Sequence, residues 1–359
     1  MGQRWPRAWK GLCVAEPILS AVITCYKDEQ AILPMHARLT QVFTSLGVNY
    51  EIIFVNDGSP DHADSVLKEL TAKDEHVLAV EHSRNFGSQN AFVSGMQLTT
   101  GDAVVLLDGD LQDPPELIAA FYAKWREGND VVYGRRTKRE GSVLLALFAR
   151  AFYLIFRGVS EVPIPLDAGD FALMDRKVVK GLLALPETDQ FLRGLRAWVG
   201  FTQTGVDYVR PKRAFGRSTH SFLKNLWWAR KGIFSFTFVP IELLGYAGLA
   251  LTTCSLCALV YLLVDSLRHP EIAHGVSTIA AMIAFFGSLN LLAVAVVGEY
   301  LIKIFEEVKR RPKFIRKAIR YGEEHYVTAA EIDAFLQRRA HGTGPMRPPS
   351  ARSFDGNEA

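Results

Sequence analysis

The sequence predicts an α/β domain built on a mostly parallel sheet, followed by a pair of membrane-spanning helices. In the first half of the 359 residues, short runs rich in Val and Ile alternate with helical patterns. This order of elements is typical of a parallel sheet that is covered by helices on both faces. Later in the chain, residues 239–264 and 276–302 are apolar over more than the ~20 residues that a helix needs to cross a bilayer.

The predicted sheet rests on five short apolar runs in the first part of the chain. In a sheet of this kind, ligands bind beyond the carboxyl ends of the strands. Polar and acidic residues follow four of the runs, so we expect a ligand site where those strand ends meet. The predicted strands are Ile18–Cys25, Glu51–Asn56, Val77–Glu81, Ala103–Leu107 and Asp130–Tyr133.

The turn after the first predicted strand reads Tyr26-Lys27-Asp28-Glu29. A dinucleotide-binding domain needs a glycine-rich turn at this place, because pyrophosphate must closely approach the start of the next helix. The turn therefore disfavours an NAD-dependent enzyme. After the second predicted strand, Asp57 is placed either to accept hydrogen bonds from a base or ribose or simply to form an Asp-Gly turn.

Asp108-Gly109-Asp110 follows the fourth predicted strand. Two carboxylates that flank one residue can supply oxygen ligands to a hard divalent cation, which also binds substrate phosphate oxygens. Such a cation would hold a nucleoside diphosphate and neutralise the charge that develops as it leaves. D-x-D sequences are common by chance, so the motif alone leaves a plain acidic turn open. Asp113 is assigned a structural role, because the Pro-Pro-Glu that follows it is typical of a helix start.

Seven segments between Pro17 and Pro312 are informative together: SAVITCYKDE, IIFVNDGSPD, EHSRNFGSQNA, VVLLDGDLQDPPE, DAGDFALMDRKVV, FLRGLRAWVGF and VGEYLIKIFEEVKRRP. They resemble, in order, the motifs of family 2 glycosyltransferases of the polyprenyl-phosphate type. This group includes bactoprenol glucosyltransferases and, more distantly, dolichol-phosphate mannose synthases. The resemblance implies a GT-A fold, a Mg or Mn cofactor, and an inverting transfer of a hexose from a nucleotide-sugar, usually a UDP-sugar such as UDP-glucose.

The resemblance also implies roles for residues on the donor side. Asp108 and Asp110 become the metal-binding D-x-D pair, and Asp110 is the closer ligand and a catalytic residue. The donor-binding residues that it implies are Tyr26 and Glu29 bordering the nucleotide, Asp57 at the base, Arg84 on the diphosphate side and Gln112 at the sugar.

On the acceptor side, the resemblance implies that Asp167–Asp170 is the acceptor loop, where an aspartate is proposed as catalytic base, and that Arg193 lies near the phosphates. A phosphate monoester is already largely ionised at neutral pH. A general base then matters less than for a hydroxyl acceptor, so we expect Asp167 or Asp170 mainly to orient groups. The chain departs from its relatives at Ala172, commonly an arginine, and at Thr219, often a lysine.

Charge is distributed unevenly around the two apolar segments. Residues 209–231 and 303–320 are rich in Lys and Arg, whereas the connection 265–275 contains a single Arg. The positive-inside rule then predicts a multi-pass protein of the inner (cytoplasmic) membrane, with the catalytic domain and both termini in the cytosol. The N-terminal residues lack the apolar core of a secretory signal.

The predicted organisation has seven parts, among them interfacial amphipathic helices that lie on the bilayer. The parts are an N-terminal extension (1–16), the GT-A catalytic domain (17–217), the interfacial helices (218–238), two transmembrane helices (239–264 and 276–302), a cytoplasmic basic helical segment (303–340) and a disordered tail (341–359).

The predicted partners are a nucleotide-sugar donor, a polyprenyl (undecaprenyl) phosphate acceptor and membrane lipids, with no nucleic acid. The resemblance also implies a homo-oligomer, specifically a tetramer. Two alternatives stay open from the sequence. One is a family 2 glycosyltransferase with a polysaccharide or protein acceptor, and the other is a non-enzymatic membrane transport or flipping component.

Overall fold

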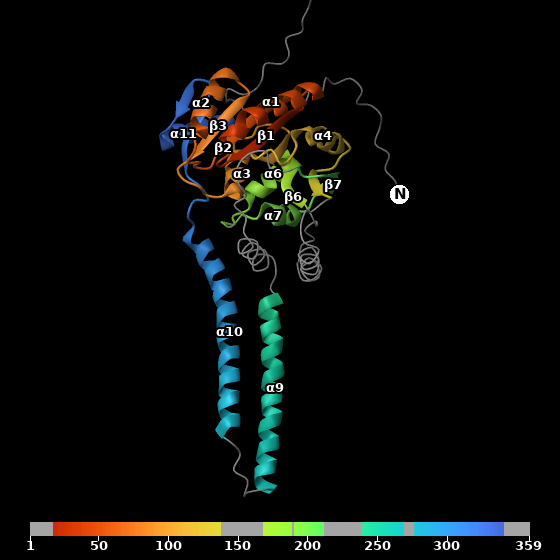
Figure 1. Ribbon diagram of the computed structural model, residues 1–359, viewed down its shortest axis with the longest axis vertical. Helices are drawn as coiled ribbons and strands as arrows, with labels where there is room; N and C mark the ends of the chain where they lie inside the picture. The colour runs from red at the N-terminus through yellow and green to blue at the C-terminus, as the bar shows by residue number, and fades with distance from the viewer. Residues whose placement is uncertain (1–16, 138–167, 189, 212–238, 269–275, 341–359) are drawn as a thin grey trace, which may run out of the picture.

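The computed structural model describes residues 17–137, 168–188, 190–211, 239–268 and 276–340. Figure 1 shows that these residues form an α/β domain from which two long helices extend. Several predictions fall outside the described residues. They are the N-terminal extension 1–16, the interfacial helices 218–238, the disordered tail 341–359, Asp167 and Thr219.

A nine-stranded sheet forms the centre of the described α/β domain, in the order β7-β5-β6-β4-β1-β2-β3-β8-β9. The pairings give seven of these nine strands one direction and leave β6 and β8 reversed. The prediction of a mostly parallel sheet is therefore confirmed, and the first predicted strand coincides with β1. The strands are β1 (Ile18–Cys25), β2 (Asn49–Asn56), β3 (Val77–His82), β4 (Ala103–Asp108), β5 (Val131–Arg136), β6 (Ala168–Asp175), β7 (Gln203–Tyr208), β8 (Arg316–Tyr321) and β9 (Glu324–Tyr326).

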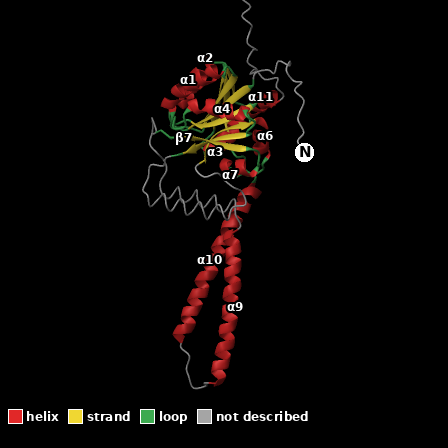
Figure 2. Ribbon diagram, turned by 90° about the vertical axis from the view of Figure 1, so that its right-hand side faces the viewer, coloured by secondary structure: helices red, strands yellow, loops and turns green. Residues whose placement is uncertain are grey.

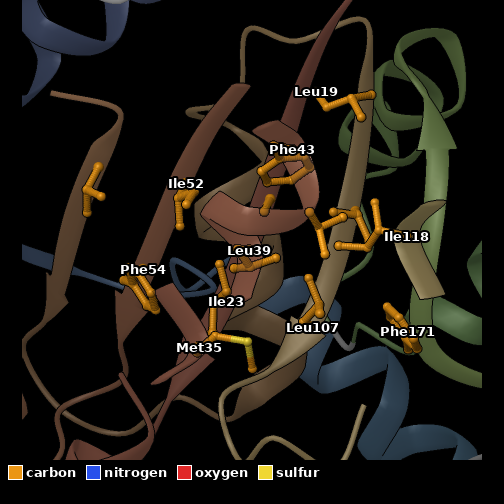
Figure 3. Packing of buried hydrophobic residues seen from close by; sticks show 14 of the residues in the cluster. Leu19, Ile23, Met35, Leu39, Phe43, Ile52, Phe54, Leu107, Ile118 and Phe171 are labelled. Carbon is orange, nitrogen blue, oxygen red and sulfur yellow. The ribbon is translucent and has the colours of Figure 1, made fainter. Parts of the chain in front are cut away.

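Helices cover both faces of this sheet (Figure 2). Successive strand side chains point to opposite faces, so Ile23 packs into one core and its neighbour Val22 into the other. Figure 3 shows the first core, where Leu39 and Phe43 lie against the sheet. Its helices are α1 (Glu29–Leu46), α2 (Ala63–Lys73), the 3-10 helix η1 (Pro115–Leu117) and α4 (Ile118–Arg126). The second core contains α3 (Ser88–Met96), α6 (Arg176–Ala184), α7 (Leu192–Trp198) and α11 (Ala329–Ala340).

The C-terminal segment corrects one prediction. The sequence predicts a basic helical segment over residues 303–340, but β8 and β9 lie within it and extend the sheet beyond β3. Ala318 and Ile319 of β8 are buried, and Gly322 makes the turn to β9 with a φ of +58°. Two basic residues of this segment pair with acids of the domain, Arg320 with Asp64 at 3.0 Å and Lys317 with Glu81 at 2.5 Å.

Two long helices, α9 (Val239–Arg268) and α10 (Val276–Lys309), extend from the α/β domain and contact each other. They contain the predicted apolar segments 239–264 and 276–302. Among the described residues, one stretch, Phe285–Lys309 in α10, is long and apolar enough to cross a membrane. The structure thus provides one candidate span by length and composition.

The end of α10 is bonded directly to the α/β domain. Glu307 accepts a hydrogen bond from the Thr188 backbone N–H at 2.9 Å, and Lys313 Nζ donates to the Leu185 carbonyl oxygen at 3.2 Å. Phe314, between α10 and β8, stacks on the ring of His82 at a centroid distance of 5.3 Å. The chain therefore passes from α10 into the sheet through fixed contacts.

Candidate active site

The carboxyl ends of three parallel strands meet at one edge of the sheet. Cys25 at the end of β1 is opposite Asn56 of β2, and Thr24 is opposite Asp108 of β4. The residues that follow these strands therefore lie close together, as the sequence predicts. The site is built from the loops after β1, β2, β3 and β4, with further side chains from β6, α7 and the segment after β7.

Tyr26 lies on the loop after β1 and Glu29 begins α1, and this part of the chain is tied to the loop after β2. The Lys27 backbone N–H donates to Ser59 Oγ at 2.7 Å, and the His62 backbone N–H donates to Glu29 Oε2 at 2.6 Å. Tyr26 is exposed at this edge. Glu29 therefore holds the two loops together, and contact of either residue with a nucleotide stays a prediction.

Asp57 is buried at the end of β2, where its carboxylate fixes the loop that leads into α3. Oδ2 accepts a hydrogen bond from the Gly87 N–H at 2.8 Å, and Oδ1 accepts one from the Phe86 N–H at 2.9 Å. His82 Nδ1 also hydrogen-bonds with Oδ1, at 2.8 Å. Because the side chain is only 2% exposed, Asp57 positions the loop 84–87. A direct contact with the base stays a prediction.

Arg84 is exposed on this same loop. Its Nη1 donates to the Asn85 carbonyl oxygen at 2.9 Å, and its guanidinium lies 4.2 Å from the centroid of the Phe86 ring. Gly58 allows the loop to pack closely on the end of β2, because a Cβ there would come within 2.5 Å of the Arg84 carbonyl carbon. Arg84 therefore lies on a loop that the Asp57 carboxylate fixes through its hydrogen bonds to Phe86 and Gly87.

The Asp108-Gly109-Asp110 turn is held against β1. The Gly109 N–H donates to the Thr24 carbonyl oxygen at 2.9 Å, and a Cβ at Gly109 would lie 2.6 Å from that oxygen. Asp110 is buried and accepts a hydrogen bond from the Gln112 backbone N–H at 3.0 Å. A glycine is thus required between the two carboxylates, and Gln112 lies directly beside them.

Arg210, two residues beyond β7, faces this turn. Its Nη2 lies 4.0 Å from Asp108 Oδ2 and 3.9 Å from Asp110 Oδ2, and its Nε lies 3.6 Å from Asp113 Oδ1. One guanidinium thus stands among three carboxylates. The sequence indicates Arg210 only as a member of a basic stretch, so its place in the site is a finding of the structure.

The structural role predicted for Asp113 is not that of a helix cap. The 3-10 helix η1 starts after Pro114, and no side chain forms a hydrogen bond that caps it. Asp113 is instead buried, and its Oδ1 accepts a hydrogen bond from Tyr208 Oη at 2.5 Å. Arg136 lies 3.9 Å away on the other side. The residue belongs to the carboxylate cluster around Arg210.

Negative charge is in excess in this cluster. Burial and the neighbouring carboxylates of Asp113, Asp170 and Asp110 raise the pKa of Asp108 to about 7, although Arg210 opposes the shift. Burial likewise raises the pKa of Asp113, against the effect of Arg210. Both shifts express the free energy needed to keep a carboxylate ionised where it is buried, to which the neighbouring carboxylates add. A second positive charge would be stabilised here.

The donor set fits a divalent cation that is shared with a substrate. One oxygen each of Asp108 and Asp110 approaches the same guanidinium nitrogen, so both can face a common cation. Within the described ranges, no group of three or more His, Cys, Asp or Glu side chains could hold a metal by itself. Mg²⁺ commonly takes one or two carboxylates and completes its shell with water and phosphate oxygens.

Asp170 in β6 is engaged with Arg193. Arg193 Nε donates to Asp170 Oδ1 at 3.1 Å, and Gln89 Nε2 donates to Asp170 Oδ2 at 2.9 Å. Burial alone would raise the pKa of Asp170, but the charge of Arg193 and its hydrogen bond outweigh burial, so the pKa is lowered. A carboxylate in this state is a weak base and a strong anchor for an arginine.

Two further residues support this pair. Gln89 Oε1 accepts a hydrogen bond from the Leu192 backbone N–H at 3.0 Å, which joins the start of α3 to the start of α7. Arg196, one turn after Arg193, is buried against the ring of Tyr133, and burial lowers its pKa to about 10. Gln89 thus holds Asp170 from α3, and Arg196 Nη2 donates to the neighbouring Gly169 carbonyl oxygen at 3.4 Å.

Comparison with known proteins decides the family. Residues 20–183 match the family model described as glycosyl transferase family 2. The uncharacterized glycosyltransferase YkcC of Bacillus subtilis (strain 168) is 39% identical over 297 residues, which cover 82% of this chain and 92% of that protein. The chain belongs to glycosyl transferase family 2. Its mixed α/β sheet, with Asp108-Gly109-Asp110 at the end of β4, is the GT-A fold of this family.

Two other similarities concern named proteins. The bactoprenol glucosyl transferase of Shigella phage SfII is 35% identical to this chain over 302 residues, which cover 83% of this chain and 97% of that protein. A solved structure of glucosyl-3-phosphoglycerate synthase from Mycobacterium tuberculosis, in complex with Mn²⁺ and UDP-glucose, covers 61% of this chain and 77% of that one, at 20% identity and a TM-score of 0.42.

For this family 2 glycosyltransferase, the structure gathers most of the predicted site residues along one edge of the sheet. Asp108, Asp110 and Gln112 lie together, and Asp170 and Arg193 form the neighbouring pair. Two groups of residues owe their place in the site to the structure alone. They are Gln89 and Arg196, which support the pair of Asp170 and Arg193, and Arg210 and Asp113, which complete the carboxylate cluster.

Proposed function

We propose that this glycosyltransferase moves a hexose from a UDP-sugar, such as UDP-glucose, onto polyprenyl (undecaprenyl) phosphate at the cytoplasmic face of the membrane. The observation that carries the proposal is the proximity of two functional groups of residues. β6 pairs antiparallel with β4, so Asp170 near the start of β6 lies close to Asp108 at the end of β4, and Asp170 in turn anchors Arg193. A donor diphosphate at Asp108 and an acceptor phosphate at Arg193 would then be neighbours. The relatives named bactoprenol glucosyl transferase support this choice of acceptor.

On the donor side, Asp108 and Asp110 would hold Mg²⁺ or Mn²⁺, which supplies positive charge to the diphosphate as it leaves. The loop 84–87, fixed by Asp57, presents Arg84 toward the same edge. Tyr26 and Glu29 would border the nucleotide. Gln112, next to Asp110, would contact the sugar, because its backbone is held by the Asp110 carboxylate.

On the acceptor side, Arg193 would bind the phosphate of the polyprenyl chain. One oxygen of this phosphate forms the new bond to the anomeric carbon, while the bond from that carbon to the diphosphate oxygen breaks and its electron pair leaves with the diphosphate. The attacking oxygen is already ionised near neutral pH, so no proton has to be removed. Asp170, with its lowered pKa, orients Arg193 rather than acting as base.

The acceptor also explains the two long helices. A polyprenyl tail stays in the bilayer, so the active site has to remain at the headgroup plane. We propose that α9 and α10 both cross the membrane and place the catalytic domain and both termini in the cytosol. The apolar stretch Phe285–Lys309 and the exposed apolar side chains along both helices support this arrangement. A homotetramer follows from the family resemblance alone.

The test uses the full chain in lipid nanodiscs that contain undecaprenyl phosphate. The protein is incubated with a panel of nucleotide-sugars, with Mg²⁺ or with EDTA, and the lipid fraction is weighed by mass spectrometry. We expect one hexose to be added to the lipid, with release of UDP, and only with the metal. Release of UDP without a glycosylated lipid would contradict the proposed acceptor. Full product formation in EDTA would contradict the metal.

A further inference from the structure

Arg210 contacts its three carboxylates in an unusually loose way. Its nitrogens lie 3.6 to 4.0 Å from the oxygens of Asp108, Asp110 and Asp113, beyond hydrogen-bond range. Its Nε is buried and makes no hydrogen bond in the part of the chain that the structure describes. By contrast, Arg38 grips Glu116 through two hydrogen bonds of 2.6 and 2.7 Å, the fork that a structural arginine normally forms. Arg210 is placed at the centre of the cluster without being locked to any member.

We propose that Arg210 stands in for the divalent cation when the site holds no substrate, and that it makes metal binding conditional on the nucleoside diphosphate. This inference rests on the proposed function, because the diphosphate is that of the donor. The guanidinium lies beside oxygens of Asp108 and Asp110 that would ligate the metal. It supplies the positive charge that these carboxylates need while the site is empty.

The charges of Arg210, the carboxylates, the metal ion and the diphosphate have to balance in this site. A metal ion that binds alone has to approach carboxylates whose charge is already partly neutralised, and it meets the like charge of Arg210 a few ångströms away. A diphosphate that arrives with the metal brings negative charge, with which Arg210 can pair as it gives up Asp108 and Asp110. Metal and nucleotide should therefore bind better together than separately. By linkage, each raises the affinity of the other by the same factor.

A simpler role for Arg210 predicts different behaviour. If Arg210 only stabilised the fold, its removal would lower the stability and leave the coupling between metal and nucleotide unchanged. Arg136 provides a matched control, because it faces Asp113 from the other side at 3.9 Å and hydrogen-bonds with Tyr208 Oη at 3.2 Å. It shares the cluster with Arg210, but no ion pair joins it to Asp108 or Asp110 among the described contacts.

The experiment measures binding rather than turnover. Binding of Mn²⁺ to the full-length protein is followed by electron paramagnetic resonance with and without UDP, and binding of UDP is followed by calorimetry with and without Mn²⁺. The proteins are the wild type, Arg210→Gln, Arg210→Lys and Arg136→Gln. We expect Arg210→Gln to bind Mn²⁺ alone at least tenfold more tightly than the wild type, and to lose at least tenfold of the enhancement by UDP. Arg210→Lys, which keeps the charge, should stay near the wild type, and so should Arg136→Gln.

The inference is overturned if Arg210→Gln binds Mn²⁺ alone no more tightly than the wild type, or if UDP enhances Mn²⁺ binding equally in both. It is also overturned if Arg136→Gln reproduces the effect, because charge anywhere in the cluster would then suffice. Failure of the proposed function looks different: the wild type would bind no Mn²⁺ even with UDP present. Circular dichroism and the Tm show whether each variant is folded. If Arg210→Gln does not fold, Arg210→Lys still allows the inference to be tested.

Discussion

Gln89 donates a hydrogen bond to Asp170 at 2.9 Å while it accepts one from the backbone N–H of Leu192 at 3.0 Å. One buried side chain thereby joins the first turn of α3, which follows the loop of Arg84, to the pair formed by Asp170 and Arg193. The loop of Arg84 and the pair of Asp170 and Arg193 are therefore parts of one bonded unit. Five predictions rest on this relationship and on other contacts in the protein.

Replacement of Gln89 by leucine should misplace the acceptor-side pair. The Leu192 N–H would be left buried without an acceptor, which costs about 1 to 3 kcal/mol of stability, and Asp170 would lose one of its donors. We expect kcat for lipid glycosylation to fall by about tenfold or more, because small misplacements at a reacting centre are costly, while the KM for the UDP-sugar changes little. Gln41→Leu, at an exposed position of α1, should leave both unchanged. Equal kcat values for the two variants would contradict this role.

Replacement of Asp170 by asparagine separates orientation from general base catalysis. Because the pKa of Asp170 lies below its ordinary value of 3.8, the carboxylate is ionised throughout the range where the enzyme would be assayed. We expect transfer by Asp170→Asn to fall by less than about 100-fold, with no recovery at high pH, since general base catalysis contributes at least about that factor. A larger loss that high pH partly restores would identify Asp170 as the base.

The same lowered pKa predicts how stability depends on pH. A carboxylate whose pKa is lower in the folded state stabilises the fold above its unfolded pKa, and this contribution is lost as pH falls through the folded value. The difference in unfolding free energy between the wild type and Asp170→Asn should therefore shrink as the pH falls from about 5 to about 3. Urea unfolding across this range measures it. A difference that grows on acidification would contradict the direction of the shift.

Replacement of Gly109 by alanine should disable the turn that is proposed to bind the metal, while the domain stays folded. The added Cβ would lie 2.6 Å from the Thr24 carbonyl oxygen, so the backbone that carries Asp108 and Asp110 must shift. We expect a loss of about 100-fold in activity and a weaker affinity for Mn²⁺. Gly181→Ala is the control, because its Cβ would have no neighbour closer than 3.8 Å, and a helical alanine is more stable than a glycine. Wild-type Mn²⁺ affinity in Gly109→Ala would refute the steric argument.

Replacement of Arg339 by methionine should loosen the C-terminal helix α11. Arg339 Nη2 lies 2.5 Å from Glu51 Oε2, and both side chains are 3% exposed. Removal of one partner of a buried ion pair leaves the other charge uncompensated and costs about 3 to 5 kcal/mol. Unfolding monitored by circular dichroism should show this loss for Arg339→Met and almost none for Arg338→Met, at the exposed neighbouring position. Similar losses for both would show that α11 is held mainly by its apolar face.

The sequence allows the donor-side end of the site to be predicted because parallel strands impose it. Each apolar run ends at the same edge of the sheet, so acids that follow separate runs must meet there. The acceptor side depends on pairings that no local pattern reveals. Gln89 and Asp170 are 81 residues apart in the chain, and they meet because β6 enters the sheet in the reverse direction between β4 and β5.

The position of Arg210 in the site and the strand β8 could not be predicted from the sequence, for a related reason. Both lie in basic stretches. There the sequence shows how many positive charges are present, but not where each one lies in the fold. Arg210 reaches Asp108 because β7 pairs in parallel with β5 at the far side of the sheet. In β8, only Ala318 and Ile319 are buried, which is too short an apolar signal to distinguish a strand from an exposed basic helix.

Because α10 leads directly into β8, the catalytic domain is not joined to this helix by a flexible linker. Phe314, stacked on His82, and Glu307, bonded to Thr188, fix the sheet to the end of the helix. If α10 crosses the bilayer as proposed, its length determines how high the catalytic edge stands above the lipid phosphates, and each residue added to the helix would raise that edge by about 1.5 Å. The number of residues in α10 would therefore determine how far the active site stands from the acceptor phosphate.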